Sequence, residues 1–235
     1  MYKLYFVTFL TFLLIFLYNG IVKTIDYLTQ IYDPGTPIAL KDIRIGGKSK
    51  SAIKQELYRA YKERRIMRAG SGIYYLPDDQ STLPPFVGFD EIVRKKYVCD
   101  DHGIPGFDAI DVYGYYTGLT FLNDLGLSQQ VPAIIEITTS RTKANKRVFT
   151  VAGSPRKAWI RKAKTDITFE NYKILQFLDM FSYATDEEIK NNQQKLRQYI
   201  RNNHFSSYLF AKYIGLYGTK TIAKISKGGL LDAFI

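Results

Sequence analysis

Cysteine and histidine are scarce in this chain of 235 residues, which contains one Cys and two His. A single thiol, Cys99, excludes an internal disulfide framework and a zinc site built from several cysteines, and it suits a reducing compartment. Cys99, Asp100, Asp101 and His102 place a thiol, carboxylates and an imidazole in consecutive positions. Because consecutive side chains rarely point at one metal ion, and the other histidine is the distant His204, the sequence predicts an exposed loop here and no metal site.

The motifs of several enzyme classes are also missing. Gly47-Lys48-Ser49 has the ending of a phosphate-binding glycine loop, but Asp42 stands where the first glycine of that motif would lie. Glu136 lacks a lysine two positions later, because residue 138 is Thr, so the Glu-x-Lys pattern of metal-dependent nucleases is not formed. The sequence therefore predicts a protein that is not an enzyme, with no catalytic residues, no metal and no cofactor.

Basic residues are abundant: 33 Lys and Arg stand against 22 Asp and Glu, giving a formal net charge of +11 and an isoelectric point near 9.5. Such a charge favours an acidic partner, which could be nucleic acid, anionic lipid or an acidic protein, and does not choose among them. With 46% hydrophobic and 15% aromatic residues, the chain can bury a core large enough for two small domains.

The segment from Gly46 to Asp78 combines a basic helix with a hairpin. Apolar residues recur at helical spacing from Ile53 to Tyr61, and Ser49 or Ser51 can cap a helix that runs from about residue 50 to residue 65. Residues 66–68 and 73–76 are two β-rich runs, joined by 69–72 with glycines at the turn. Residues 41–68 contain ten Lys or Arg against three acids, so the segment suits a polyanion.

The preceding residues extend this pattern. Residues 21–31 predict a first helix, Pro34-Gly35 ends it, and residues 39–43 predict a short second helix. Helix, short helix, basic helix and hairpin is the order of a winged helix-turn-helix, which binds duplex DNA.

We expect the DNA contacts to come from the start of the basic helix and from the hairpin. The helix residues would enter the major groove or hold its phosphates, and the hairpin residues would contact the adjacent backbone or minor groove. The helix residues are Lys48, Ser49, Lys50, Ser51, Lys54, Gln55 and Tyr58, and the hairpin residues are Arg68 and Ser71. The alternative is a charged helix face that is merely solvated.

The second half of the chain predicts an α+β domain in which strands precede a helical part. Strands are expected at 133–139, at 147–151 as its antiparallel partner, and at Trp159-Ile160. Helices are expected at 89–97, 114–125, 169–180, 186–202 and 208–217. The domain organisation predicted for the whole chain is an apolar segment at 1–20, a winged helix at 21–80, a linker at 81–85 and the α+β domain at 86–235.

A second basic block lies in that domain. Residues 141–164 contain nine Lys or Arg and no acid, which favours either a second DNA contact or a docking face for an acidic protein surface. Trp159 could stack on a base or could be a half-buried core residue. The residues expected on this surface are Arg141, Lys143, Lys146, Arg147, Arg156, Lys157, Arg161 and Lys162.

Residues 113–138 resemble a family signature. The run YGYYTG at 113–118 is followed by NDLGLSQQVP at 123–132 and by an Ile-Glu-Ile-Thr strand, and together they resemble the AbiEi-like antitoxin family of abortive-infection systems. The resemblance covers about residues 21–235 and implies a winged helix joined to an α+β antitoxin domain. It also implies a bacterial protein of phage defence that represses its own operon and counters a nucleotidyltransferase-like toxin of the type IV class.

Residues 1–18 are strongly apolar, a feature that the family pattern lacks. Leu4 to Tyr18 carries no charge, and extension to Val22 gives 19 residues, which is at the low end of the length of a membrane-spanning helix. No small-x-small cleavage site follows, as a signal peptide would require. The segment therefore predicts a membrane or surface anchor, a helix docked on the body, or a start codon assigned upstream of the true one.

The leading hypothesis is a DNA-binding transcriptional autorepressor and antitoxin that binds double-stranded operator DNA. It would be cytoplasmic, or membrane-associated if residues 1–18 are retained. One alternative is a membrane-tethered basic signalling or interaction protein with a winged-helix domain. Another is a nucleic-acid enzyme acting through Cys99 to His102.

Overall fold

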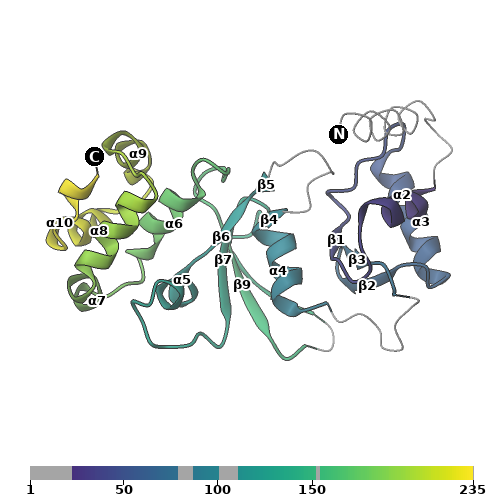
Figure 1. Cartoon of the computed structure of the whole chain (residues 1–235), viewed down its shortest axis with the longest axis horizontal. Coiled ribbons are helices and arrows are strands. Elements are labelled where there is room, and N and C mark those ends of the chain that lie inside the picture. Colours follow the sequence, from purple (N-terminus) through teal and green to yellow (C-terminus); the bar gives the residue numbers. More distant parts are fainter. Residues whose placement is uncertain (1–22, 79–86, 101–110, 152–153, 235) are drawn as a thin grey trace, which may run out of the picture. The chain divides into compact units, whose positions relative to one another are not determined.

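The computed structural model describes residues 23–78, 87–100, 111–151 and 154–234 (Figure 1). The described residues up to Lys95 form one compact unit, and those from Lys96 onward form a second. Helices and strands are mixed in the chain, so the predicted α+β class is confirmed. The predicted apolar segment at 1–20 and the predicted linker at 81–85 lie outside the described residues.

In the described residues up to 78, the first unit has two helices and a small sheet. Helix α2 (Thr24–Ile31) precedes strand β1 (Ile38–Ala39), and helix α3 (Lys50–Lys62) precedes a hairpin of β2 (Met67–Gly70) and β3 (Ile73–Tyr75). The three strands are antiparallel, in the order β1-β3-β2. The basic helix and the hairpin thus form where the sequence predicts them.

The short helix predicted at 39–43 is wrong. Ile38 and Ala39 pair with β3, and residues 40–42 form a turn in which the Asp42 N–H donates to the Ala39 carbonyl. Both side chains of β1 are buried, so this apolar pair is better placed in the sheet than in a single helical turn. The order helix, strand, turn, helix and hairpin does not confirm a winged helix, and that assignment stays a prediction.

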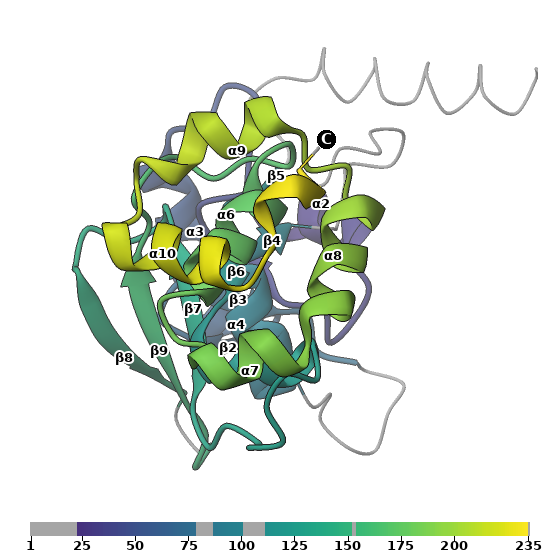
Figure 2. The same ribbon diagram turned by 90° about the vertical axis from the view of Figure 1, so that its left-hand side faces the viewer.

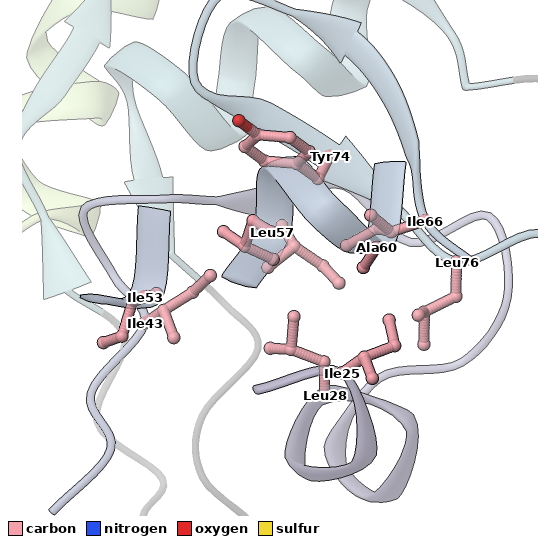
Figure 3. Close-up of a cluster of buried hydrophobic side chains, with 10 residues drawn as sticks. Ile25, Leu28, Ile43, Ile53, Leu57, Ala60, Ile66, Tyr74 and Leu76 are labelled. Carbon is pink, nitrogen blue, oxygen red and sulfur yellow. The ribbon is translucent and has the colours of Figure 1, made fainter. Parts of the chain in front are cut away.

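One hydrophobic core holds the first unit together. Figure 3 shows Leu57 and Ala60 of α3 facing Ile25 and Leu28 of α2. Tyr61, which the spacing places on the same apolar stripe, is instead 40% exposed. The core residues are Ile25, Leu28, Ile38, Ile43, Ile53, Leu57, Ala60, Ile66, Tyr74 and Leu76. Because this core uses one side of α3, the opposite side is left to the solvent.

Helix α4 (Phe89–Tyr97) has the predicted bounds and contains the point where the two units divide. Cys99 is buried in strand β4 (Cys99–Asp100), which pairs with β5 (Asp111–Val112), so the predicted exposed loop is wrong at Cys99. Asp101 and His102 lie outside the described residues.

A four-stranded sheet forms the centre of the second unit. Its order is β6 (Gly114–Tyr116), β7 (Ile135–Thr139), β9 (Lys157–Lys162) and β8 (Lys146–Thr150). The predicted antiparallel pairing of β7 with β8 is wrong, because β9 lies between them and runs parallel to β7. This register places Ile137 beside Ile160, both fully buried, and leaves the mostly exposed β8 at the edge.

Helices complete the second unit. The predicted helix at 114–125 is shorter: its first residues form β6, and α5 spans Gly118–Asp124. The predicted helix at 186–202 is divided at Asn192 into two, and α10 was not predicted. Figures 1 and 2 show the later helices gathered beyond the sheet. They are α6 (Tyr172–Met180), α7 (Asp186–Asn191), α8 (Gln193–Asn202), α9 (Ser207–Ile214), α10 (Thr219–Lys227) and the 3₁₀ turn η1 (Leu231–Ala233).

Aromatic rings fill the core of this helical part. Phe177 of α6 packs edge to face on Phe181 and is stacked on Tyr199, with ring centroids 5.3 and 5.5 Å apart. Phe205 and Phe234 also contact Phe177. Across the described ranges, every helix is too short or too polar to cross a membrane.

Candidate nucleic-acid interface

The outward side of α3 presents a continuous polar row. Ser51, Gln55, Tyr58 and Lys62 follow one another at helical spacing and are all exposed. The Tyr58 ring is 59% exposed, and the Lys62 ammonium lies 5.6 Å from its centroid. Lys62 was not among the predicted contacts, although the spacing of the other three residues would have identified it.

Two lysines border this row near the start of the helix. Lys50 and Lys54 lie one turn apart, both are exposed, and neither has an ion-pair partner among the described residues. The first turn of α3 contains no acidic side chain. Because the amino terminus of a helix attracts anions, the two ammonium groups and the helix end together favour a phosphate at this position.

Lys48 takes no part in that surface. Its ammonium lies 2.6 Å from the Glu56 carboxylate, and its side chain is 11% exposed. Glu56 also accepts a hydrogen bond of 2.8 Å from the N–H of Thr24, the first residue of α2. Burial opposes ionisation of Glu56, but the hydrogen bonds from Lys48 and Thr24 outweigh it and lower the pKa of this carboxyl to about 2. The ion pair joins the two helices.

Ser49 likewise has a structural role. It is the N-cap of α3, and its Oγ accepts a hydrogen bond of 3.2 Å from the Ala52 N–H. The residue is exposed, so its backbone and hydroxyl remain at the edge of the polar row.

The hairpin presents Arg68 and Ser71, and both are exposed. The Arg68 Nε donates to the Gly70 carbonyl at 3.2 Å, which holds the guanidinium beside the turn with further N–H donors left over. Gly72 has φ +72°, a left-handed conformation that glycine adopts without strain.

The second basic block does not form one surface of unpaired cations, because three of its arginines contact side chains of the second unit, although one of them, Arg147, is exposed. The Arg141 guanidinium lies 3.0 Å from the Tyr113 ring centroid and 3.6 Å from Asp111. Arg147 donates to the Tyr97 hydroxyl, and Arg161 is 2.8 Å from Glu136.

The remaining members of the block are exposed. Lys146 on β8 and Lys157 on β9 project from the same face of the sheet, and the Lys146 ammonium lies 3.6 Å from the Trp159 ring centroid. Lys162 belongs to the opposite face. Lys143 lies in the loop before β8, and Arg156 lies just before β9.

A buried polar cluster behind the sheet was not foreseen. The Asp179 carboxylate of α6 accepts hydrogen bonds from Thr117 at 2.6 Å and from Thr138 at 3.4 Å. Burial raises the pKa of Asp179 although those hydrogen bonds favour its charged form. The cluster joins α6 to the sheet. No local pattern could have found it, because its members are distant in sequence.

The described residues contain no group of three or more His, Cys, Asp or Glu that could hold a metal ion. Comparison with protein-family models, curated proteins and solved structures finds no match for this chain. The AbiEi-like resemblance therefore stays a prediction.

Proposed function

We propose that this protein is a transcriptional autorepressor that binds double-stranded operator DNA in the cytoplasm and also acts as an antitoxin. The observation that carries the DNA-binding part is the outward side of α3, where Lys50, Lys54 and Lys62 surround the hydrogen-bonding side chains of Ser51 and Gln55. The exposed polar side of a single helix fits the major groove of duplex DNA, which is wide enough to admit one α-helix.

The side chains of α3 divide into two roles. Lys50, Lys54 and Lys62 hold phosphates, which contributes affinity without sequence preference. Gln55 and Ser51 face the base edges, and a glutamine amide can pair with adenine through two hydrogen bonds. Arg68 at the hairpin contacts the neighbouring backbone or minor groove. Lys48 does not contribute to this proposed interface, because its ammonium forms an ion pair with Glu56.

The test replaces Lys50 and Lys54 together by alanine and measures binding of a duplex containing the region upstream of the gene. We expect weaker binding and a salt dependence that is less steep by about 1.8 in log K against log salt, since each duplex phosphate that a lysine neutralises contributes about 0.9. The matched control is Lys220→Ala with Lys227→Ala, which removes the same charge from the exposed side of α10. Equal weakening in both double variants would reject α3 as the interface.

The antitoxin part rests on the family resemblance. The GLSQQVP run of that resemblance lies in the loop after α5, where Gln129 and Gln130 are exposed and Val131 is 83% exposed. These side chains are free to meet a partner protein. Co-expression with the product of an adjacent nucleotidyltransferase-like gene tests the proposal: the wild-type chain should restore growth. Val131→Asp should not, while Lys50→Ala with Lys54→Ala should still restore it. Growth inhibition that the wild-type chain fails to relieve would reject the antitoxin role.

A further inference from the structure

Strands β8 and β9 form an antiparallel ribbon with one open face. On that face Lys146 lies opposite Arg161, Val148 opposite Trp159, and Thr150 opposite Lys157. We refer to these six side chains as the ribbon face. Figure 2 shows β8 at the outer edge of the sheet, with β9 beside it. The other face of the ribbon belongs to the core, where Phe149, Ala158 and Ile160 are buried.

The middle of the ribbon face is apolar and exposed. Val148 is 56% exposed, and Trp159 is half-buried beside it. Lys146, Thr150 and Lys157, which surround this pair, are exposed. Val148 on the edge strand β8 is exposed, and Trp159 on the neighbouring β9 is only partly covered by its own unit, so a ligand with an apolar surface would bury both side chains.

The charge of the ribbon face is positive, and among the described residues only one of its three cations has a carboxylate partner. Arg161 is paired with Glu136, whereas Lys146, which lies opposite Arg161, and Lys157, at the other end of the ribbon, are not paired with a carboxylate in that part of the chain. The sequence from 141 to 164 contains no acid. A ligand of this face must therefore combine negative charge with flat apolar groups.

We propose that the ribbon face binds single-stranded nucleic acid. Phosphates would contact Lys146 and Lys157, and a base would stack on Trp159 against Val148. The Lys146 ammonium now covers the indole ring at 3.6 Å. Base stacking on an aromatic ring is stronger than an exposed cation–π pair, so a base displaces this ammonium, which then lies beside the phosphate. This activity is separate from operator binding, because it uses the second unit and not α3.

Two other polyanions fit the face less well. Duplex DNA keeps its base faces inside the helix, so Val148 and Trp159 would meet only its backbone. An acidic protein surface would satisfy the lysines, but carboxylates offer no flat apolar group for the indole. A single strand supplies both.

Trp159 is the only tryptophan of the chain, so its fluorescence reports on the ribbon face alone. The probes are a 12-nucleotide oligothymidylate, a 12-nucleotide oligouridylate, a 12-base-pair duplex without the operator, and polyglutamate. They are titrated into the full chain and into the Lys50→Ala, Lys54→Ala variant. We expect both single strands to quench Trp159 emission saturably in both proteins.

Substitutions on the ribbon face give the second measurement, by anisotropy of a labelled oligothymidylate. Lys146→Ala with Lys157→Ala should reduce the salt slope by about 1.4, since each phosphate contact on a single strand contributes about 0.7. Trp159→Leu should weaken binding about tenfold, and Trp159→Phe, which keeps a ring, should restore most of it. The control is Lys220→Ala with Lys227→Ala, and circular dichroism verifies the fold of each variant.

Each other outcome overturns the proposal. Quenching by the duplex as strong as that by the single strands would mean a contact with phosphates only. Quenching by polyglutamate without quenching by the oligonucleotides would assign the face to an acidic protein. Single-strand binding that leaves Trp159 emission unchanged, or no binding at all, would remove nucleic acid from this face. All of these results leave operator binding by α3 standing, since it is measured on the operator duplex.

Discussion

At the scale of single residues, Glu56 shows how one carboxylate organises the first unit. It pairs with Lys48 and accepts the Thr24 N–H, so its charge links α2 to α3. Its pKa is lowered to about 2 from an ordinary value of 4.5. A lowered folded-state pKa means stability that is present above pH 4.5 and is lost as the pH falls towards 2. The first unit should therefore be acid-sensitive through this group.

We predict that Glu56→Gln destabilises the first unit at pH 7 and that its difference from the wild type shrinks as the pH falls from 4.5 towards 2. The measurement is hydrogen exchange of the α2 and α3 amides across this pH range, corrected for intrinsic rates. Glu63→Gln is the control, because Glu63 is exposed at the end of α3. Equal protection in Glu56→Gln and wild type at pH 7 would contradict the prediction.

Gly114 is a second residue whose identity is set by its surroundings. A Cβ atom here would lie only 2.9 Å from the Thr138 carbonyl oxygen, and it would overlap the carbonyl oxygen of Tyr97. Backbone oxygens cannot move aside as a flexible side chain can. Gly114 is the first of the two glycines in the YGYYTG run, so close packing alone accounts for a glycine at this position of the motif.

We predict that Gly114→Ala destabilises the second unit by about 1–3 kcal/mol or more, the usual cost of overpacking. Urea unfolding followed by Trp159 fluorescence measures it, because Trp159 lies in the same sheet. Gly215→Ala is the matched control: nothing lies within 4 Å of a Cβ there, and the backbone is right-handed. That variant should be neutral or more stable by about 0.4–1 kcal/mol. Similar destabilisation in the two variants would mean that crowding around Gly114 is not the cause of the loss.

At the scale of elements, the cap of α3 allows stability and DNA contact to be separated. Ser49→Ala removes the hydrogen bond to Ala52 and should cost about 1 kcal/mol. Ser49→Asp keeps a capping oxygen and adds a negative charge that the helix end stabilises. The same charge repels a phosphate beside Lys50. We therefore predict wild-type stability but weaker duplex binding for Ser49→Asp, measured by thermal unfolding and by anisotropy. Duplex binding unchanged in Ser49→Asp would place the helix end away from the DNA backbone.

The local sequence pattern was sufficient to predict some helices and strands but not others. The apolar spacing of α3 and the glycines of the hairpin act within a few residues, and both elements form close to their predicted bounds. The strand β1 was missed because two apolar residues have no period of their own and are ordered only by pairing with β3. For the same reason the order β7-β9-β8 could not be read from the strands singly, since their register depends on distant partners.

In the candidate interface, too, some features follow from the local sequence and others depend on residues distant in the sequence. The exposed row of Ser51, Gln55 and Tyr58 is a consequence of helical period, and the sequence predicts it. The removal of Lys48 from that surface depends on Glu56 and on the position of α2, which no local pattern contains. Likewise, the arginines of the second block can be counted from the sequence, but the rings and carboxylates that they contact lie in distant segments of the second unit.

At the scale of the whole molecule, the two units have separate cores of different chemistry. The first is mainly aliphatic, with isoleucine and leucine from α2, α3 and the hairpin. The second has aromatic clusters around Phe177. The two proposed nucleic-acid surfaces belong to different units: α3 to the first, and the ribbon face to the second. Because the two surfaces belong to different compact units, we expect the free-energy effects of substitutions on them to add.

We therefore predict that the variant with all four lysines 50, 54, 146 and 157 replaced by alanine binds the operator duplex as weakly as the α3 pair alone. It should bind oligothymidylate as weakly as the ribbon pair alone. The physical alternative is general attraction by the net charge of +11, which four substitutions would lower to +7. In that case, replacing any pair of lysines, including Lys220 with Lys227, would weaken the binding of the duplex and of oligothymidylate by the same factor. A further decrease of duplex binding in the fourfold variant, without a decrease in the Lys220 and Lys227 control, would mean instead that the ribbon face contributes to operator binding.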